Sequence, residues 1–114
     1  GAFHTRYMAS ALEGYAQAVE TTGTSEPTTT LLSNADGQAV TSAEDAMTKL
    51  VAQLTRPVRW DLCNETMRQL NITAIVEFPP AGALTGIAKR ELRGVATHAV
   101  KTPADLDGLT ETRR

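Results

Sequence analysis

The sequence predicts an α/β fold in which parallel strands are flanked by helices. Predicted helices alternate with predicted strands along the chain, which is typical of a parallel sheet. Two of the three predicted strands are nearly continuous apolar runs, as in strands that helices cover on both faces. Three strands make a thin sheet, so we expect chain on the N-terminal side to complete it. The alternative is a complete small domain with an engineered or processed terminus.

A helix with one buried face is predicted for residues 7–19. Apolar side chains recur there every three or four positions, at Met8, Leu12, Tyr15, Ala16 and Val19. Glycine and proline among small polar residues predict a loop at 21–27. Residues 28–33 are β-branched and then apolar, which predicts a short strand ending in a turn at 34–37.

Two further helices are predicted between residues 42 and 70. Ser42 is a typical N-terminal cap, and acidic residues follow it in the first turn. This helix should end near Arg56, because proline disfavours helical geometry in the residue before it. Pro57 suits the first turn of the next helix. The side chains expected to be buried are Ala46, Leu50, Val51, Leu54, Val58, Trp60, Leu62, Met67 and Leu70.

The remaining elements follow residue 71. Residues 72–78 predict a buried strand, which the prolines and glycine of 79–82 interrupt. Helical spacing returns at 84–92, and residues 95–100 predict another strand. Residues 103–107 predict a final helical turn.

The composition gives no indication of a nucleic-acid or membrane partner. Eleven Lys and Arg residues against thirteen Asp and Glu residues give a formal charge of −2, without any block of like charges. The apolar runs are far shorter than the roughly 20 residues of a membrane-spanning helix. The first residues lack the apolar core of a signal peptide. The single cysteine, Cys63, cannot form an internal disulfide, which favours a cytoplasmic location.

His4 and Cys63 are the candidates for acid–base or nucleophilic chemistry. A neutral imidazole in a loop before a helix can accept a proton, but a general base needs a nucleophile within hydrogen-bond reach. None of the serines lies in a Gly-x-Ser-x-Gly elbow. Cys63 lies near Trp60 and Met67 on a predicted helix and is expected to be a small core residue. Position alone therefore leaves a structural role for His4 open.

No metal or cofactor site is expected. His4 and His98 are far apart in sequence, and no ligand cluster with suitable spacing surrounds either. The glycines of residues 82–86 precede a predicted helix, where backbone N–H groups could meet an anion. The segment lacks the ending of a phosphate-binding loop and fits a tight turn equally well. Residues 89–93 could touch phosphate, but a solvated helix face also accounts for them.

Four sequence motifs occur together in this chain. The most specific is Gln-Leu-x-x-Pro-Val-x-Trp at 53–60. The others are Gly-Ala-Phe-His-Thr at 1–5, Leu-Ser-Asn-Ala-Asp-Gly at 32–37 and Leu-Thr-Gly-Ile-Ala-Lys-Arg at 84–90. Together they make nearly the whole chain resemble the C-terminal part of the malonyl-CoA:acyl-carrier-protein transacylases of fatty-acid synthesis, in their actinobacterial, mycobacterial-type form.

The resemblance implies an acyltransferase. In this family a serine in a Gly-His-Ser-x-Gly elbow takes malonyl from CoA and passes it to the phosphopantetheine thiol of acyl carrier protein. His4 matches the general base that takes the serine proton, and Gln53 matches the residue whose backbone carbonyl orients that histidine. One base can serve both half-reactions by taking and returning a proton. Malonyl-CoA and acyl carrier protein are therefore the implied partners.

The resemblance also implies the domain organisation. Residues 1–114 match the C-terminal segment of the large subdomain, in an α/β-hydrolase-like core that a ferredoxin-like insert interrupts. The serine elbow, the oxyanion-hole glutamine and the arginine that pairs with malonate are absent from this chain, and would lie in the missing N-terminal part. We therefore expect the isolated chain to be inactive. One departure is Pro-Pro-Ala-Gly at 79–82, where many relatives have Gly-Pro-Gly.

Two other hypotheses stay open. One is a non-catalytic assembly module or self-associating fragment, because exposed sheet edges invite pairing with another copy. The other is a standalone hydrolase that uses Cys63 and His4.

Overall fold

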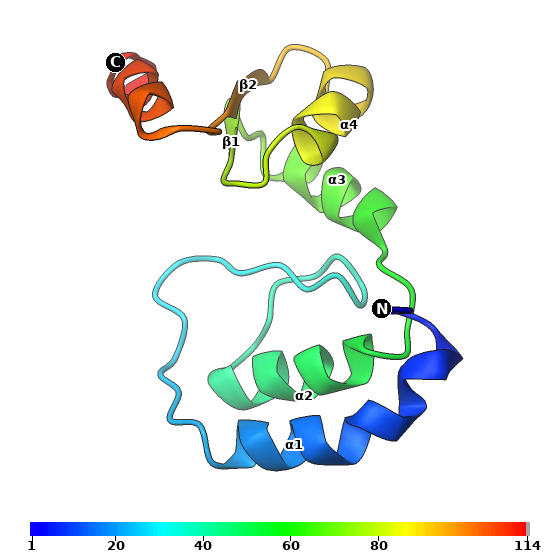
Figure 1. The fold of residues 1–114 in the computed structure, drawn as a ribbon. Coiled ribbons are helices and arrows are strands. Elements are labelled where there is room, and N and C mark those ends of the chain that lie inside the picture. The colour runs from blue at the N-terminus through cyan, green and yellow to red at the C-terminus, as the bar shows by residue number, and fades with distance from the viewer. Residues whose placement is uncertain (114) are drawn as a thin grey trace. The chain divides into compact units, whose positions relative to one another are not determined.

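Helices and strands follow one another along the chain as expected of the α/β class, which is confirmed (Figure 1). The computed structural model describes residues 1–113. The chain divides into two units, one of residues Gly1–Thr66 and one from Met67 onward. Among the described residues, no helix is both long enough and apolar enough to cross a bilayer.

The first unit is mainly helical. A 3-10 helix, η1 (Arg6–Ala11), leads directly into α1 (Leu12–Glu20), so the helix predicted for 7–19 is present but begins with tighter turns. The α1 helix packs against α2 (Ala43–Gln53), which runs in the opposite direction (Figure 1). As predicted, Ser42 caps α2, and its hydroxyl accepts a hydrogen bond from the N–H of Asp45 at 3.0 Å.

The strand predicted for residues 28–33 is wrong. Residues 28–31 are exposed, and only an isolated antiparallel bridge joins Leu32 to Ala39. β-branched residues favour a strand only where a neighbouring strand takes up the backbone groups. Here the pairing is confined to the end of the segment, where the Val40 N–H donates to the Leu31 carbonyl and the Ser33 N–H to the Gln38 carbonyl, both at 2.9 Å. The turn predicted at 34–37 is present. The Gly37 N–H donates a hydrogen bond to the Ser33 carbonyl across it, at 2.8 Å.

Gly37 fixes this turn against the helix α3 (Trp60–Gln69). Its φ is +70°, and a Cβ there would collide with the backbone and Cβ of Leu62, so only glycine fits. The α3 helix starts later than the predicted start at Pro57. Its first hydrogen bonds run from the N–H groups of Leu62 and Cys63 to the Arg59 carbonyl, and the Arg59 N–H itself donates to the Asn34 carbonyl of the turn at 2.8 Å.

The second unit contains a β-α-β motif. The strands β1 (Ala74–Glu77) and β2 (Ala96–Ala99) are parallel, with Ala74 opposite Ala96, and α4 (Ala83–Glu91) connects and contacts both (Figure 1). The parallel pairing of these two predicted strands is confirmed, but the sheet has two strands in the described residues, not three. The predicted final helical turn is a 3-10 helix, η2 (Pro103–Arg113).

The expectation of strands buried on both faces is wrong. Val76 is 39% exposed and Phe78 65%, because two strands and one helix leave much of the sheet uncovered. Four side chains expected to be buried on the predicted helices are exposed as well: those of Tyr15, Leu50, Val58 and Leu70. The buried apolar residues are mostly small: Ala43, Cys63, Ala88, Leu92 and Val100.

Candidate functional site

His4 stands out in the backbone of the first unit. It lies in the loop that precedes η1 and has a φ of +66°, a left-handed conformation that non-glycine residues seldom adopt. Residues held in such conformations concentrate at functional sites, where surrounding contacts enforce them. The contacts around His4 are therefore the first place to look for function.

The end of α2 holds His4 through two consecutive carbonyl groups. The His4 backbone N–H donates to the Leu54 carbonyl at 2.9 Å. Its ring Nδ1 lies 2.8 Å from the Gln53 carbonyl oxygen. Gln53 is the last residue of α2 and Leu54 is its C-cap, so both carbonyls lie where backbone acceptors lack partners within the helix. The backbone and the ring of His4 thus cap one helix end together.

Thr5 braces the other side of the same loop. Its hydroxyl donates to the Ala2 carbonyl at 2.6 Å and accepts from the Tyr7 N–H at 3.3 Å. The Thr5 carbonyl also accepts from the Met8 N–H at 3.0 Å, which starts η1. The residues on both sides of His4 are therefore tied to each other.

The contact with Gln53 fixes the proton of a neutral His4 ring. A carbonyl oxygen can only accept, so Nδ1 must carry the hydrogen of this hydrogen bond. In the neutral imidazole the other nitrogen, Nε2, then has a free lone pair. The His4 side chain is exposed, so this basic nitrogen is accessible.

Cys63 has the opposite environment. It is buried at 2% exposure, and its Sγ donates weakly to the Ser33 carbonyl at 3.5 Å. Burial raises the pKa of the Cys63 thiol, and the negative charges of Asp36 and Asp61 raise it further. A buried thiol that resists ionisation is a poor nucleophile, which argues against a hydrolase that uses Cys63.

Glu77 is a polar residue that sequence reasoning missed. It ends β1, is buried, and its carboxylate accepts three hydrogen bonds from the first turn of α4: from the N–H groups of Thr85 at 2.8 Å, Gly82 at 2.9 Å and Leu84 at 3.0 Å. The anion that the 82–86 loop could meet is thus supplied by the chain itself. The sequence signal that could have identified it is a single acidic residue at the end of an apolar strand, shortly before the loop at 79–82 and the helix that follows.

These hydrogen bonds decide the charge of Glu77. Burial by itself would raise the pKa of the carboxyl group, but the N–H groups of Thr85, Gly82 and Leu84 favour the ionised form more strongly. The net result lowers the pKa of Glu77 from 4.5 to about 2. Glu77 is therefore a structural anion at neutral pH and not a proton donor.

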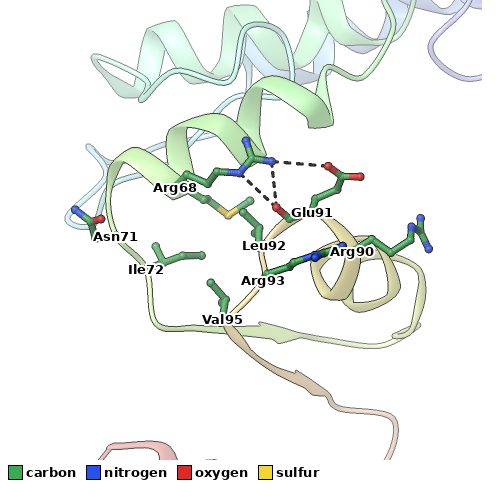
Figure 2. A pocket seen from close by; sticks show the side chains of 9 residues that line it. Arg68, Asn71, Ile72, Arg90, Glu91, Leu92, Arg93 and Val95 are labelled. Atoms are coloured by element: carbon green, nitrogen blue, oxygen red, sulfur yellow. Dashed lines mark hydrogen bonds and ion pairs between the residues drawn. The ribbon is translucent and has the colours of Figure 1, made fainter.

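An open pocket of about 440 Å³ lies in the second unit (Figure 2). In its wall, the Arg68 guanidinium donates to the Glu91 carbonyl at 3.1 Å and lies 3.8 Å from the Glu91 carboxylate (Figure 2). The other side chains that line it are Met67, Asn71, Ile72, Arg90, Leu92, Arg93 and Val95. None of these is a nucleophile paired with a base. The pocket therefore offers no catalytic arrangement of its own.

The remaining sequence candidates concern metal binding. His98 lies on β2, in the other unit from His4. Within residues 1–113, no group of three or more His, Cys, Asp or Glu side chains could hold a metal ion. Of the predicted site residues, the structure brings His4 and Gln53 into contact.

Comparison with known proteins points to one group of enzymes. The chain is 67% identical to the malonyl CoA-acyl carrier protein transacylase of Mycolicibacterium smegmatis, over 97% of this chain and 40% of that protein. The crystal structure of MCAT from Mycobacterium tuberculosis superposes with a TM-score of 0.91 at 66% identity, over 96% of this chain and 36% of that one. No family model matches the sequence.

A third comparison involves a complex. A malonyl-transacylase solved with its type II PKS acyl-carrier protein matches with a TM-score of 0.87 at 29% identity, over 96% of this chain and 36% of that chain. The chain thus spans about two-fifths or less of the length of the relatives it matches.

Proposed function

We propose that this chain, which is homologous over nearly its whole length to part of the malonyl CoA-acyl carrier protein transacylases, is the C-terminal portion of such an enzyme. It supplies the general base, His4, to a reaction that moves malonyl from CoA to acyl carrier protein in fatty-acid synthesis. Residues 1–114 form part of the large subdomain in this proposal. The cytoplasmic location rests on the lone Cys63 and stays a prediction.

One observation carries the proposal. The ring of the exposed residue His4 is oriented by a backbone carbonyl at 2.8 Å from Nδ1, in a loop with a positive φ, so that Nε2 is the nitrogen free to accept a proton in the neutral ring. An imidazole that served only as a cap would not need a second nitrogen open to solvent. A base that takes a proton from an external nucleophile does need one.

The proposed reaction proceeds in two balanced half-reactions. A serine hydroxyl from the rest of the enzyme attacks the malonyl thioester carbon while His4 Nε2 takes its proton. The C–S bond breaks, and the departing CoA thiolate receives that proton. In the second half, Nε2 takes the proton of the phosphopantetheine thiol and the sulfur attacks the carbonyl carbon of the seryl ester. The ester C–O bond breaks, and the departing serine oxygen recovers the proton from Nε2. Malonyl has then moved without net change in protonation.

The test uses a chimera, in which this chain replaces the matching segment of the Mycolicibacterium smegmatis relative. We expect the chimera to transfer malonyl from CoA to acyl carrier protein, and His4→Ala to lower kcat at least about 100-fold. The isolated 114-residue chain should show no transfer. A chimeric His4→Ala variant with unchanged kcat, or robust turnover by the isolated chain, would refute the proposal.

A second candidate, self-association of the isolated chain, is favoured by its exposed apolar side chains. Tyr7 is 70% exposed, and Phe3, Leu70 and Phe78 each exceed half exposure. Burying such side chains against a second copy would remove apolar surface from water, which favours association. Sedimentation velocity separates the cases: a concentration-dependent dimer supports self-association, and a monomer at all concentrations contradicts it.

A further inference from the structure

The side chain of Gln53 makes contacts that a backbone role does not require. It is buried at the C-terminal end of α2, with 8% of its surface exposed. Its amide Nε2 donates to the carbonyl oxygen of Arg56 at 3.1 Å and to that of Pro57 at 2.9 Å. One side chain therefore ties the last residue of α2 to the segment that leaves the helix.

The backbone between these points is held weakly by its own hydrogen bonds. The N–H groups of Leu54, Thr55 and Arg56 each donate to the carbonyl three residues earlier in the chain. The N–O distance is 3.3 Å in each of these hydrogen bonds. These bonds are longer than the usual N–H to O distance of about 2.7–3.2 Å. Pro57 has no N–H and adds none. The Gln53 amide is thus the shortest tie within this turn.

The same turn carries the two groups that hold His4. The carbonyls of Gln53 and Leu54 accept from the His4 ring at 2.8 Å and from its backbone N–H at 2.9 Å. Any movement of this turn therefore moves the ring. The side chains of Arg56 and Pro57 are exposed, so water can reach this turn and satisfy its carbonyls if the amide is removed.

We infer that the Gln53 side chain is a positioning residue, which keeps the α2 terminus in the geometry that aims His4 Nε2. The inference rests on the proposed function of His4 as the base. Misplacing a base by about 1 Å can cost up to about 100-fold in rate. Because His4 acts in the chemical step, the loss should appear in kcat and leave KM for malonyl-CoA nearly unchanged.

The test compares two substitutions in the chimera described above. Gln53→Met keeps the length of the side chain and removes its donor, and we expect it to lower kcat about tenfold with KM changed less than about twofold. Gln17→Met, at an exposed glutamine of α1, is the matched control and should leave kcat unchanged. The thermal midpoint should fall by only a few degrees, because solvent reaches the freed carbonyls.

A double variant shows whether the effect passes through His4. In a His4→Ala background there is no ring left to aim, so Gln53→Met should reduce the residual rate no further. A purely structural role would lower the rate by the same factor in both backgrounds. That additive outcome, or wild-type kcat in a folded Gln53→Met variant, would overturn the inference.

Two outcomes keep this inference separate from the function it rests on. If His4→Ala itself leaves kcat unchanged, the proposed function fails first. If His4→Ala abolishes transfer while Gln53→Met does not alter kcat, only the positioning role fails. Should Gln53→Met not fold, Gln53→Asn, which keeps the amide but withdraws it by one methylene, should show the same kcat loss. A folded Asn variant with full kcat would then overturn the inference.

Discussion

The side chains of His4 and Glu77 each cap the end of a helix from another segment, and the two caps differ in whether a polar atom of the capping side chain remains available. At the C-terminal end of α2, His4 Nδ1 donates to the Gln53 carbonyl, and Nε2 of this exposed residue takes no part in the cap. At the N-terminal end of α4, both oxygens of Glu77 are consumed by three backbone N–H groups. The same unsatisfied helix-end groups attract both side chains. His4 keeps one ring nitrogen that can accept a proton, which makes it a candidate for catalysis. Glu77 uses both carboxylate oxygens in its cap, which makes it a structural residue.

Replacing His4 by asparagine should break the chemistry at α2 and keep the cap. Asparagine tolerates a positive φ and offers an amide N–H to the Gln53 carbonyl, but it has no basic nitrogen. We expect His4→Asn to lower kcat of the chimera about 100- to 10,000-fold, while the thermal midpoint stays within about 2 °C. Steady-state kinetics and calorimetry on the same sample measure both quantities. A large loss of stability with little loss of kcat would mean that His4 is only a cap.

Replacing Glu77 by glutamine should weaken the cap of α4 and leave the chemistry nearly unchanged. One end of the new amide carries donors that face backbone donors, and the charge that stabilises the start of α4 is lost. We expect Glu77→Gln to lower the thermal midpoint of the chimera by several degrees, and kcat of the molecules that remain folded to change less than about threefold. Glu20→Gln, at an exposed acid, is the control and should shift the midpoint little. If Glu77→Gln were as stable as the parent, the account of this cap would be wrong.

The pH dependence of stability sharpens the same contrast. The pKa of Glu77 falls from 4.5 to about 2 on folding, so its ionised form stabilises the folded state. This contribution is fully present above pH 4.5 and is lost as the pH falls through about 2. Denaturant titrations measure the free energy of unfolding of the chimera and of its Glu77→Gln variant. The difference between these two free energies should be largest above pH 5 and should shrink as the pH is lowered. A difference that grows toward low pH would contradict the assignment.

The smallest effect is expected at Thr5. Thr5→Ala removes the hydroxyl that links Ala2 to Tyr7 around His4. Loss of such a cap costs about 1 kcal/mol of stability, and a loosened loop should lower kcat a few-fold. Thr5→Ser keeps the hydroxyl and should retain both properties. Equal kcat in the Ala and Ser variants would show that the loop does not depend on this hydroxyl.

Much of the fold was predictable because local patterns decide it. The Ser42 cap, the helical spacing near residues 12–19 and 84–91, and the β-α-β order each depend on neighbours in sequence. The strand at 28–33 was predicted wrongly because strand formation depends on a partner that local sequence does not reveal. The prediction that both faces of the strands are buried was wrong for the same reason. Whether Val76 and Phe78 are buried depends on which other segments cover them, and the local sequence does not reveal that.

The candidate site shows the same division. His4 and Gln53 were matched through their family motifs, because position alone gave His4 no partner. The Glu77 cap and the side-chain contacts of Gln53 emerged only from three-dimensional structure. In each case a side chain forms hydrogen bonds with backbone groups. Every residue has these backbone groups, so the sequence does not indicate which of them serve as partners.

The tautomer of His4 tests the central claim most directly. Nitrogen NMR of the chimera with ring-labelled histidine, assigned by loss of the signal in His4→Asn, reports which ring nitrogen carries the proton in the neutral form. The hydrogen bond to the Gln53 carbonyl predicts a protonated Nδ1 and an unprotonated Nε2. A neutral ring protonated at Nε2 would contradict the account, because Gln53 could then not orient it and the exposed nitrogen could not accept a proton.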